Sequence, residues 1–263
     1  MFAAPAPPST AGGRLSYAKR HSARMDTHST ANRAAFFDFD GTLVSSNVVT
    51  RYAFFAKNHP RRLEACRRYG KLLLTVPLWI GLDMYSRRRF NEVFYRQYRN
   101  LSKDWLYECG EALFREEIAP KIFSAAQSAV ESDRAAGYRL VLVSGGLEFA
   151  IAPAARHFGF DHVICNHLEY AGGVATGKVV PPLLAEAEKV RAIENFCREY
   201  NVDSTRSKAY SDSLSDLPML ECVGQPAAVN PDRGLRRAAA KRNWPILDLR
   251  SGPVPRRMDD GNG

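Results

Sequence analysis

The chain has 263 residues, 45% of them hydrophobic and 25% charged, and its 37 Lys and Arg outnumber 28 Asp and Glu for a formal net charge of +9. This composition excludes collagen-like, mucin-like and wholly disordered proteins, and the length suits one large domain or a core with an inserted second domain. Five scattered cysteines without a C-x-x-C pair indicate neither a disulfide framework nor a zinc site. We therefore expect a protein of the reducing cytoplasm.

The first 33 residues differ in composition from the rest of the chain. They are rich in Pro, Ala, Ser and Gly and carry five basic residues against one acid, which predicts a disordered basic tail. They lack the apolar stretch of a secretory signal, whereas an organelle transit peptide stays open as an alternative because the segment is basic and poor in acids. The longest apolar run, residues 72–82, has 11 residues and contains Pro77, so it is too short to span a bilayer as a helix.

An α/β pattern starts at residue 34. The apolar run 34–37 predicts a buried strand that ends at Asp38, and residues 138–143 predict a second strand, followed by the turn 144–146 and a helix over 147–158. Further strands are predicted at 161–165, 207–211, 225–229 and 245–249, and further helices at 185–200 and 232–242. Strands that alternate with helices in this way predict a parallel α/β sheet flanked by helices.

Residues 47–115 interrupt this alternation, because they carry Tyr, Phe, Leu and Arg at helical spacing without the alternation of a strand. An insertion directly after the first strand lies over the carboxyl ends of a parallel sheet, which is where such sheets bind ligands. We therefore predict an all-helical cap at 47–115, an α/β core made of 34–46 and 116–250, and a disordered tail at 251–263.

Much of the basic surplus lies in this predicted cap. Residues 51–115 carry 14 basic and six acidic residues, whereas residues 116–263 carry 18 and 19. The first interpretation is a helical lid whose aromatic side chains pack inward and whose arginines face water. The alternative is an interfacial surface for an anionic membrane or a lipid-like phosphate, which would place the protein peripherally at a membrane. Nucleic acid is not expected as a partner, because no nucleic-acid-binding motif is present.

The strongest local motif is Asp38-Phe39-Asp40-Gly41-Thr42, at the end of the first predicted strand. Two carboxylates two residues apart at a strand end can face one site, where they repel each other unless a cation lies between them or one of them holds a proton. Taken alone, the motif is also compatible with a polar turn, since Asp and Gly favour turns.

The later strands and helices place further polar groups at the same expected edge of the sheet: Ser144, Gly145, Lys189, Asp212 and Asp216. The hydroxyl and free amides after the second strand suit a phosphate group, and the lysine supplies a fixed positive charge. The carboxylates of Asp38, Asp212 and Asp216, together with backbone and water oxygens, are the hard ligands that suit Mg²⁺. A shared site is therefore favoured over a simple turn.

In their order and spacing these residues resemble the four motifs of the haloacid dehalogenase-like (HAD) superfamily hydrolases, subfamily IB, the branch that includes phosphoserine phosphatase. Asp38-x-Asp40-Gly41-Thr42 is similar to the first motif, Ser144-Gly145 to the second, Lys189 to the third and Asp212-x-x-x-Asp216 to the fourth. The match runs in order from residue 34 to about 249, with the cap between the first two motifs. The resemblance implies a Rossmann-like core with an inserted helical cap, and a phosphatase.

The resemblance also implies how the carboxylates divide the work. Asp38 is the expected nucleophile, which forms an aspartyl-phosphate, and Asp40 is the expected general acid and base. Mg²⁺ is expected on the Asp38 carboxylate, the Asp40 main-chain carbonyl and Asp212. Asp216 is expected to orient the waters of the metal.

The phosphoryl oxygens of the substrate are expected to bind hydrogen-bond donors and a cation, namely Thr42, Ser144, the Gly145 amide and Lys189. One position departs from the family. Asn47 lies nine residues after the nucleophile, where phosphoserine phosphatases carry a Glu that pairs with the substrate ammonium group. We therefore expect Asn47 to alter substrate specificity.

The leading hypothesis is a Mg²⁺-dependent phosphatase that hydrolyses a small organic phosphate monoester through an aspartyl-phosphate. A phosphotransferase of the same family is one alternative. A basic membrane- or nucleic-acid-binding protein with a vestigial site is another. Residues 168–179 resemble the short β-loop that precedes the Lys motif in this branch and are expected to shape the edge of the substrate pocket.

Overall fold

The computed structural model describes residues 32–251, without the side chains of residues 83 and 84. The two predicted disordered tails lie outside this range apart from residues 32, 33 and 251. No helix within the described range is both long enough and apolar enough to cross a bilayer.

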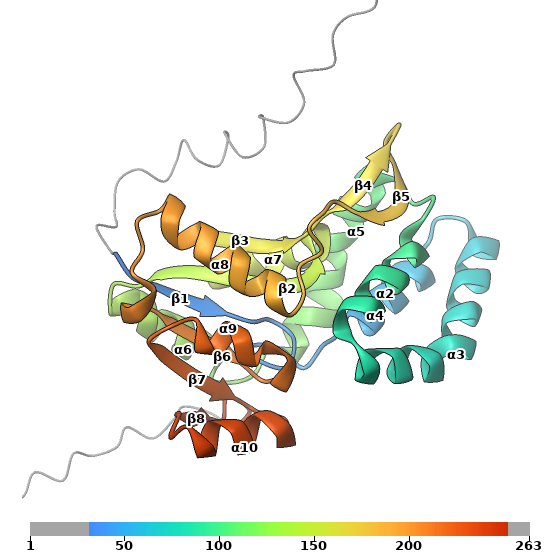
Figure 1. The fold of residues 1–263 in the computed structure, drawn as a ribbon. Coiled ribbons are helices and arrows are strands. Elements are labelled where there is room, and N and C mark those ends of the chain that lie inside the picture. Colours follow the sequence, from blue (N-terminus) through green and yellow to red (C-terminus); the bar gives the residue numbers. More distant parts are fainter. Residues whose placement is uncertain (1–31, 252–263) are drawn as a thin grey trace, which may run out of the picture. The chain divides into compact units, whose positions relative to one another are not determined.

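Six parallel strands form the central sheet, in the order β3-β2-β1-β6-β7-β8 (Figure 1). The strands are β1 (Ala34–Phe37), β2 (Arg139–Leu147), β3 (His162–Asn166), β6 (Lys208–Ser211), β7 (Gln225–Val229) and β8 (Ile246–Leu247). The apolar strand β1 pairs with β2 on one side and β6 on the other, and all four of its residues are buried. The predicted parallel α/β fold is confirmed.

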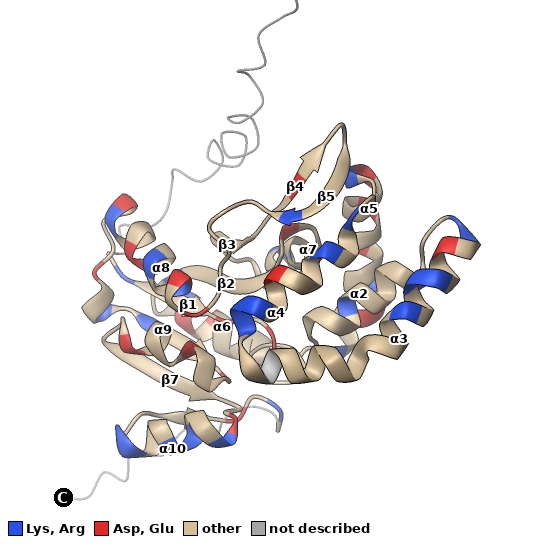
Figure 2. Cartoon of the chain, turned by 45° about the vertical axis from the view of Figure 1, so that its right-hand side comes forward, with Lys and Arg blue, Asp and Glu red and all other residues tan. Residues whose placement is uncertain are grey.

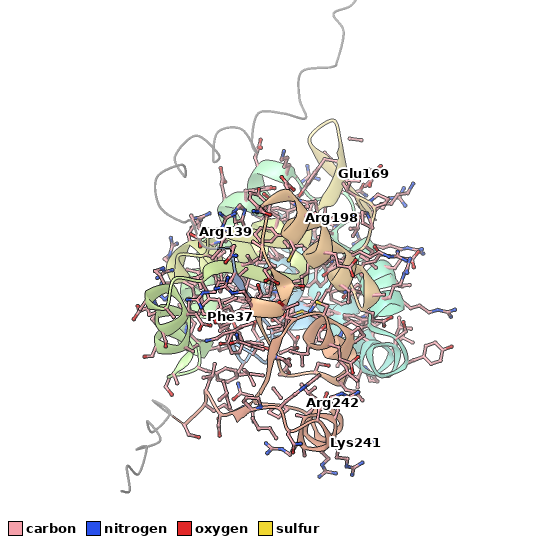
Figure 3. All side chains as sticks on the ribbon, turned by 60° about the vertical axis from the view of Figure 1, so that its left-hand side comes forward. Phe37, Arg139, Glu169, Arg198, Lys241 and Arg242 are labelled. Carbon is pink, nitrogen blue, oxygen red and sulfur yellow. The ribbon has the colours of Figure 1, made fainter. Side chains whose placement is uncertain are left out.

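Helices of the core cover both faces of this sheet: α6 (Ala126–Ala135), α7 (Glu148–Phe158), α8 (Ala187–Glu199), α9 (Leu217–Glu221) and α10 (Arg233–Lys241). Successive side chains of a strand point to opposite faces, so Phe37 packs in the apolar cluster with α6 and α7, whereas Phe36 packs with α8, α9 and α10. Figure 3 shows Phe37 inside this arrangement and Lys241 projecting outward near the end of α10.

Helices also fill the segment between β1 and β2. These are α2 (Val48–Lys57), α3 (Arg62–Tyr85), α4 (Arg87–Phe94) and α5 (Lys103–Leu113), with a 3₁₀ turn at Tyr95–Tyr98, a π-helical turn at Phe114–Ile118 and a 3₁₀ turn at Ala119–Lys121. Asn47, Ser86 and Ser102 begin α2, α4 and α5, because their side chains accept hydrogen bonds from backbone N–H groups of the first turn. We refer to residues 48–113 as the cap.

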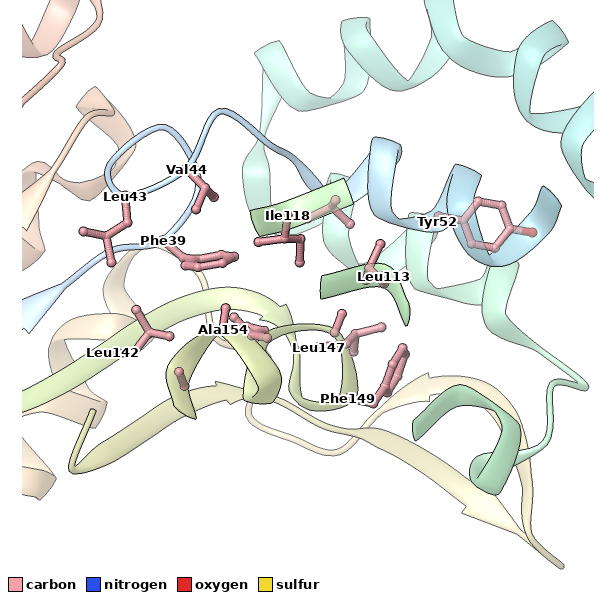
Figure 4. Packing of buried hydrophobic residues seen from close by; sticks show 14 of the residues in the cluster. Phe39, Leu43, Val44, Tyr52, Leu113, Ile118, Leu142, Leu147, Phe149 and Ala154 are labelled. Carbon is pink, nitrogen blue, oxygen red and sulfur yellow. The ribbon is translucent and has the colours of Figure 1, made fainter. Parts of the chain in front are cut away.

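Aromatic side chains join the cap to the core. Phe55 from α2 and Tyr98 contact Phe149 from α7 edge to face, with ring centroids 5.3 and 5.6 Å apart. Figure 4 shows Tyr52 and Leu113 from the cap in the same cluster as Phe149. One continuous apolar cluster therefore fixes the cap beside the sheet.

A two-stranded antiparallel hairpin of β4 (Leu168–Ala171) and β5 (Val174–Val179) lies where the sequence resembled a β-loop. Its turn contains Gly172 and Gly173, whose φ angles of 56° and 77° lie in the left-handed region that glycine adopts without strain. The Lys103 backbone N–H donates to the Gly173 carbonyl at 2.8 Å, so the hairpin contacts the start of α5.

Candidate active site

The carboxyl ends of β1, β2 and β6 meet at one edge of the sheet, because these three strands are parallel neighbours. Asp38 directly follows β1, Asp212 directly follows β6, and Lys189 lies in the first turn of α8. A cavity of about 300 Å³ lies at this edge. Its lining includes seven of the predicted site residues, namely Asp38, Asp40, Ser144, Gly145, Lys189, Asp212 and Asp216.

Lys189 bridges two of these carboxylates. Its Nζ donates to Asp38 Oδ1 at 2.7 Å and to Asp216 Oδ2 at 2.8 Å, and all three side chains are more than nine-tenths buried. Burial opposes the charged form of Lys189, but the negative charges of Asp216 and Asp38 outweigh burial and raise the pKa of the lysine. Ser211 Oγ donates to Asp216 Oδ2 at 2.8 Å, which fixes that carboxylate from the other side. The lysine therefore presents a permanent positive charge at the base of the cavity.

Asp38 and Asp212 lie near each other and disfavour each other's charge. Burial, opposed by Lys189 and reinforced by Asp216, raises the pKa of Asp38 to about 6. Burial, together with the charges of Asp38 and Asp216, raises the pKa of Asp212 to about 8. Thr42 Oγ1 lies 3.3 Å from Asp38 Oδ2 and 3.4 Å from Asp212 Oδ1, and its single proton serves one of them at a time. When both carboxylates are ionised, they repel each other.

The donors around this pair fit a hard divalent cation. Gly41 has a φ of 79°, and a Cβ at this position would lie 2.0 Å from Asp212 Oδ2, so only glycine lets that carboxylate lie against the turn after β1. No group of three or more His, Cys, Asp or Glu side chains within residues 32–251 is arranged as a metal site. The Asp38 and Asp212 carboxylates both line the cavity, and the family resemblance implies the Asp40 main-chain carbonyl as a third oxygen donor. Mg²⁺ accepts such a set, because it binds through one or two carboxylates and keeps several waters.

The Asp40 side chain forms an ion pair with the cap. Arg51, from α2, donates through Nη1 to Asp40 Oδ1 at 2.5 Å and through Nη2 to Asp40 Oδ2 at 2.6 Å. Ser46 Oγ also donates to Asp40 Oδ1, at 3.1 Å. The Arg51 side chain is only 3% exposed, whereas that of Asp40 is 23% exposed and lines the cavity. Sequence reasoning missed Arg51, because one arginine among 14 basic residues of the segment 51–115 carries no distinguishing signal.

The predicted turn at 144–146 is wrong, because β2 continues to Leu147 with a register irregularity between Ser144 and Leu147. This glycine-containing end of β2 is held by two side chains from other elements. The Gly145 carbonyl accepts hydrogen bonds from the Tyr95 hydroxyl at 2.5 Å and from Asn166 Nδ2 at 2.7 Å. The Gly146 backbone N–H donates to Ser144 Oγ at 3.1 Å. Tyr95 comes from the cap and Asn166 from the end of β3, so both elements fix the position of the end of β2.

Asn91 is a cavity residue that the sequence did not reveal. It lies on α4, one helical turn after Arg87, and both residues line the cavity. Asn91 is 1% exposed, and its Oδ1 has no hydrogen-bond partner. A buried amide oxygen without a donor costs about 1–3 kcal/mol, and because Asn91 lines the cavity, a donor on a bound ligand or a water can reach this oxygen.

Two predicted site residues lie outside the cavity lining. Thr42 is fully buried behind it, where it contacts Asp38 and Asp212 as described above. Asn47 is exposed, and its Oδ1 accepts a hydrogen bond from the Thr50 backbone N–H at 2.9 Å within a capping box at the start of α2. The structure therefore does not bring Asn47 to the substrate cavity, and a local role at the helix terminus accounts for its side chain.

Comparisons with known proteins agree with this arrangement. Residues 35–221 match the family of haloacid dehalogenase-like hydrolases. A probable phosphatase of Mycobacterium tuberculosis is 30% identical over 254 residues, which cover 94% of this chain and 81% of that protein. A phosphoserine phosphatase of the same organism is 29% identical over 225 residues, which cover 82% of this chain and 71% of that protein.

A crystal structure of a protein of unknown function from Bordetella pertussis Tohama I is similar in fold, with a TM-score of 0.70 and 30% identity over 84% of this chain and all of that chain. The family match covers most of the described sheet together with the cap and the four motifs. The chain therefore belongs to the haloacid dehalogenase-like hydrolases, and it is similar to a relative named as a phosphoserine phosphatase.

Proposed function

We propose that this hydrolase is a Mg²⁺-dependent phosphatase, which cleaves a small organic phosphate monoester through an aspartyl-phosphate on Asp38. The observation that carries the proposal is the buried bridge Asp38–Lys189–Asp216 beside Asp212. Phosphoryl transfer depends on positioning and on charge stabilisation. This cavity offers a nucleophile in the Asp38 carboxylate, a permanent cation in Lys189 and a further carboxylate in Asp212.

The reaction has two steps. In the first, an Asp38 carboxylate oxygen attacks the phosphorus, and the bond between phosphorus and the ester oxygen breaks. The leaving oxygen takes a proton from Asp40, which in its protonated form accepts from Arg51 through one oxygen and donates through the other. In the second, a water oxygen attacks the phosphorus of the acyl phosphate and gives a proton to Asp40. This step releases inorganic phosphate, restores the Asp38 carboxylate and returns Asp40 to its starting protonation state.

The negative charge of the phosphoryl group has to be balanced throughout. Lys189 supplies a positive charge, and the Ser144 hydroxyl and the Gly145 amide supply hydrogen-bond donors at the end of β2. Thr42 adds a hydroxyl from behind Asp38. A Mg²⁺ ion held by Asp38, Asp212 and the Asp40 carbonyl would supply further charge neutralisation to the phosphoryl oxygens.

The cavity supports a small substrate. Its volume of about 300 Å³ is at the lower end of the range for ligand sites, which favours a small organic phosphate over a polymer. The unpartnered Asn91 Oδ1 supports a leaving group that carries a hydroxyl or ammonium donor. Phosphoserine, the substrate in the name of one relative, meets both conditions, and so do other small amino and hydroxy alcohol phosphates.

A generic ester tests the reaction before the natural substrate is known. We expect the purified chain with Mg²⁺ to hydrolyse p-nitrophenyl phosphate, and Asp38→Asn to reduce kcat by at least about 1,000-fold. Asp104→Asn, which makes the same chemical change at an exposed position on α5, should keep the wild-type rate. Equal rates for Asp38→Asn and wild type, or no Mg²⁺-dependent turnover by wild type on a broad panel of phosphate esters, would exclude the proposed function.

A phosphotransferase of the same family would form the same acyl phosphate and pass it to an alcohol instead of water. Adding alcohol acceptors to the assay separates the two activities. Release of inorganic phosphate in proportion to the leaving group supports the phosphatase, whereas a shortfall of phosphate matched by a new phosphate ester supports the transferase.

A further inference from the structure

The second half of α3 presents an apolar surface to solvent. Every described residue of α3 from position 73 onward that is exposed is also apolar, namely Leu73, Leu74, Pro77, Leu78, Ile80, Gly81 and Tyr85. Leu74 is 85% exposed, Tyr85 is 74% exposed and Leu78 is 62% exposed. We call these seven residues the α3 ridge. Isolated exposed leucines are ordinary, but a run of this kind along one helix marks a surface that contacts something.

The rest of the helix shows why this face points outward. Leu72 and Trp79 are only one or two residues from the ridge leucines, but they lie on the opposite side of the helix and are buried. The Trp79 ring packs edge to face on Phe94 at 5.2 Å. The core-facing stripe of α3 is therefore already occupied by the cap's own side chains. The ridge is a second apolar stripe, which packing within the described residues leaves uncovered.

Basic residues flank the ridge at both ends. Arg67 and Lys71 precede it on α3, and Arg88 and Arg89 follow it on α4, and all four are exposed. The Arg89 guanidinium lies 5.6 Å from the Tyr85 ring centroid, so one flanking charge is held directly beside the ridge. Figure 2 shows this distribution, with a stretch of α3 free of basic residues between blue segments near the start of α3 and on α4.

We propose that the α3 ridge docks the protein on an anionic lipid surface, with α3 lying in the plane of the interface. An apolar stripe with Lys and Arg at its borders is the pattern of interfacial helices, which bury the stripe roughly 5–10 Å into the boundary of headgroups and acyl chains. The flanking Lys and Arg side chains then lie at the level of the lipid phosphates, where each is attracted to the anionic lipid headgroups. No described helix spans a bilayer, so the contact is peripheral.

Charge and size argue against a second copy of the chain as the occupant. Pairing two ridges across a twofold axis would bring the basic borders of both copies together, which is repulsive. The ridge also covers only about 20 Å of one helix, with a width of about 10 Å, whereas a stable protein interface buries roughly 800 Å² on each partner. The large exposed hydrophobic side chains of the described cap all lie on α3, so no neighbouring element extends the patch.

The docking would also orient the active site. α3 ends at Tyr85 and α4 begins at Arg87, so the ridge is separated by a single residue from the helix that supplies Arg87 and Asn91 to the cavity. A lipid surface under α3 therefore lies next to the cap wall of the cavity. This inference does not depend on the proposed reaction, because it concerns where the cap binds and not what the site does.

Vesicle sedimentation tests the proposal with the full chain. We expect wild type to sediment with vesicles of phosphatidylcholine and phosphatidylserine, more weakly with phosphatidylcholine alone, and less as salt rises. Leu74→Gln/Leu78→Gln should reduce the partition coefficient at least tenfold, because glutamine preserves helix propensity and adds no charge. Val163→Gln/Ile246→Gln, a matched pair of exposed apolar positions on β3 and β8, should leave partitioning unchanged.

The control variants separate the ridge from other contributions. The basic residues 1–33 remain in every variant, so a loss that is specific to Leu74→Gln/Leu78→Gln is assigned to α3. Wild-type circular dichroism and an unchanged melting temperature show that the variants are folded whether or not the enzyme assay succeeds. Three results would overturn the proposal: wild type that does not sediment with anionic vesicles, equal partitioning of the ridge variant, or a wild-type dimer that becomes monomeric in the ridge variant without vesicle binding.

Discussion

Arg51 of the cap and Asp40 of the core form a two-bond ion pair, with distances of 2.5 and 2.6 Å between their paired atoms. The pair crosses from α2 to the turn after β1, so it joins the inserted segment to the residue expected to move protons. Arg51 is nearly fully buried and has lost the hydration of its charge, and the ion pair with Asp40 is the main interaction that offsets this loss. The cap is therefore coupled to Asp40 by a specific contact as well as by apolar packing.

Removing this arginine should affect both stability and turnover. In Arg51→Leu, Asp40 loses both hydrogen bonds from the guanidinium, and we expect the free energy of unfolding to fall by about 2–3 kcal/mol. This loss is smaller than for a fully buried ion pair, because the Asp40 side chain is partly exposed to water. We expect kcat to fall by about tenfold to 100-fold, because the proton carrier is no longer oriented. Denaturant unfolding and steady-state kinetics measure the two effects.

Arg51→Lys and a double variant sharpen this test. Lysine keeps the charge but cannot make two parallel bonds, so it should recover stability more than activity. In Arg51→Leu/Asp40→Leu the energetic coupling of the pair is obtained from a double-mutant cycle. Strict additivity of the two single changes would contradict a direct coupling between the residues.

Lys189 is expected to be indispensable for activity. Lys189→Met leaves Asp38 and Asp216 buried without their shared cation, so the negative charge needed on the nucleophile becomes harder to maintain. We expect kcat/KM to fall by at least about 1,000-fold. Lys178→Met, on the exposed part of β5, provides the matched control and should retain activity. Activity of Lys189→Met within tenfold of wild type would show that the bridge is not part of the catalytic machinery.

The raised pKa of Asp212 predicts how stability varies with pH. Between its ordinary value of 3.8 and about 8, the folded state of the metal-free protein holds a proton that the unfolded chain has released. The contribution of Asp212 to the free energy of unfolding therefore falls as pH rises through this window. Asp212→Asn should flatten this dependence, and Asp104→Asn should not, as measured by thermal unfolding in EDTA.

The same carboxylates predict the pH dependence of metal binding. At low pH a cation has to displace the proton of Asp212, whereas at high pH it relieves the repulsion between Asp38 and Asp212. We therefore expect Mg²⁺ to raise the melting temperature more at about pH 8.5 than at about pH 6. A Mg²⁺-induced shift that is independent of pH, or equal in Asp212→Asn, would count against a site at these carboxylates.

Asn91 provides a test of substrate recognition. Asn91→Leu removes an acceptor that has no partner in the free protein, so the free energy of unfolding should not fall by more than about 1 kcal/mol. For a substrate whose leaving group carries a hydroxyl or ammonium donor, we expect kcat/KM to fall about tenfold, whereas p-nitrophenyl phosphate should be unaffected. Asn195→Leu, an exposed asparagine on α8, is the control. Equal losses on both kinds of substrate would contradict recognition of the leaving group.

The carboxylate motifs could be predicted from the sequence because each of them follows a recognisable strand. β1 and β7 agree with their predicted ranges, and Asp38 and Asp212 meet because parallel neighbours end at one edge of the sheet. Once the strands are recognised, their parallel order in the sheet is enough to predict that Asp38 and Asp212 lie close together. Asn47 shows the limit of motif spacing, because a helix that begins at this residue uses its side chain as a cap.

Residues whose role depends on distant partners could not be predicted. Helix α6 was not foreseen, because Asp133 interrupts its apolar pattern; in the fold this buried carboxylate pairs with Lys208 and accepts from the Tyr210 hydroxyl, both on β6. Arg51 and Asn91 reach the site only because the cap packs against the core. Such tertiary contacts leave no periodic signal in the sequence.

The most direct test of the central claim is to trap the covalent intermediate. Wild type mixed with a radiolabelled phosphate ester and Mg²⁺, then quenched in acid, should carry label that hydroxylamine releases, on the peptide that contains Asp38. Asp38→Asn should carry none. Label on another residue, or equal label on Asp38→Asn, would contradict the assignment of Asp38 as the nucleophile.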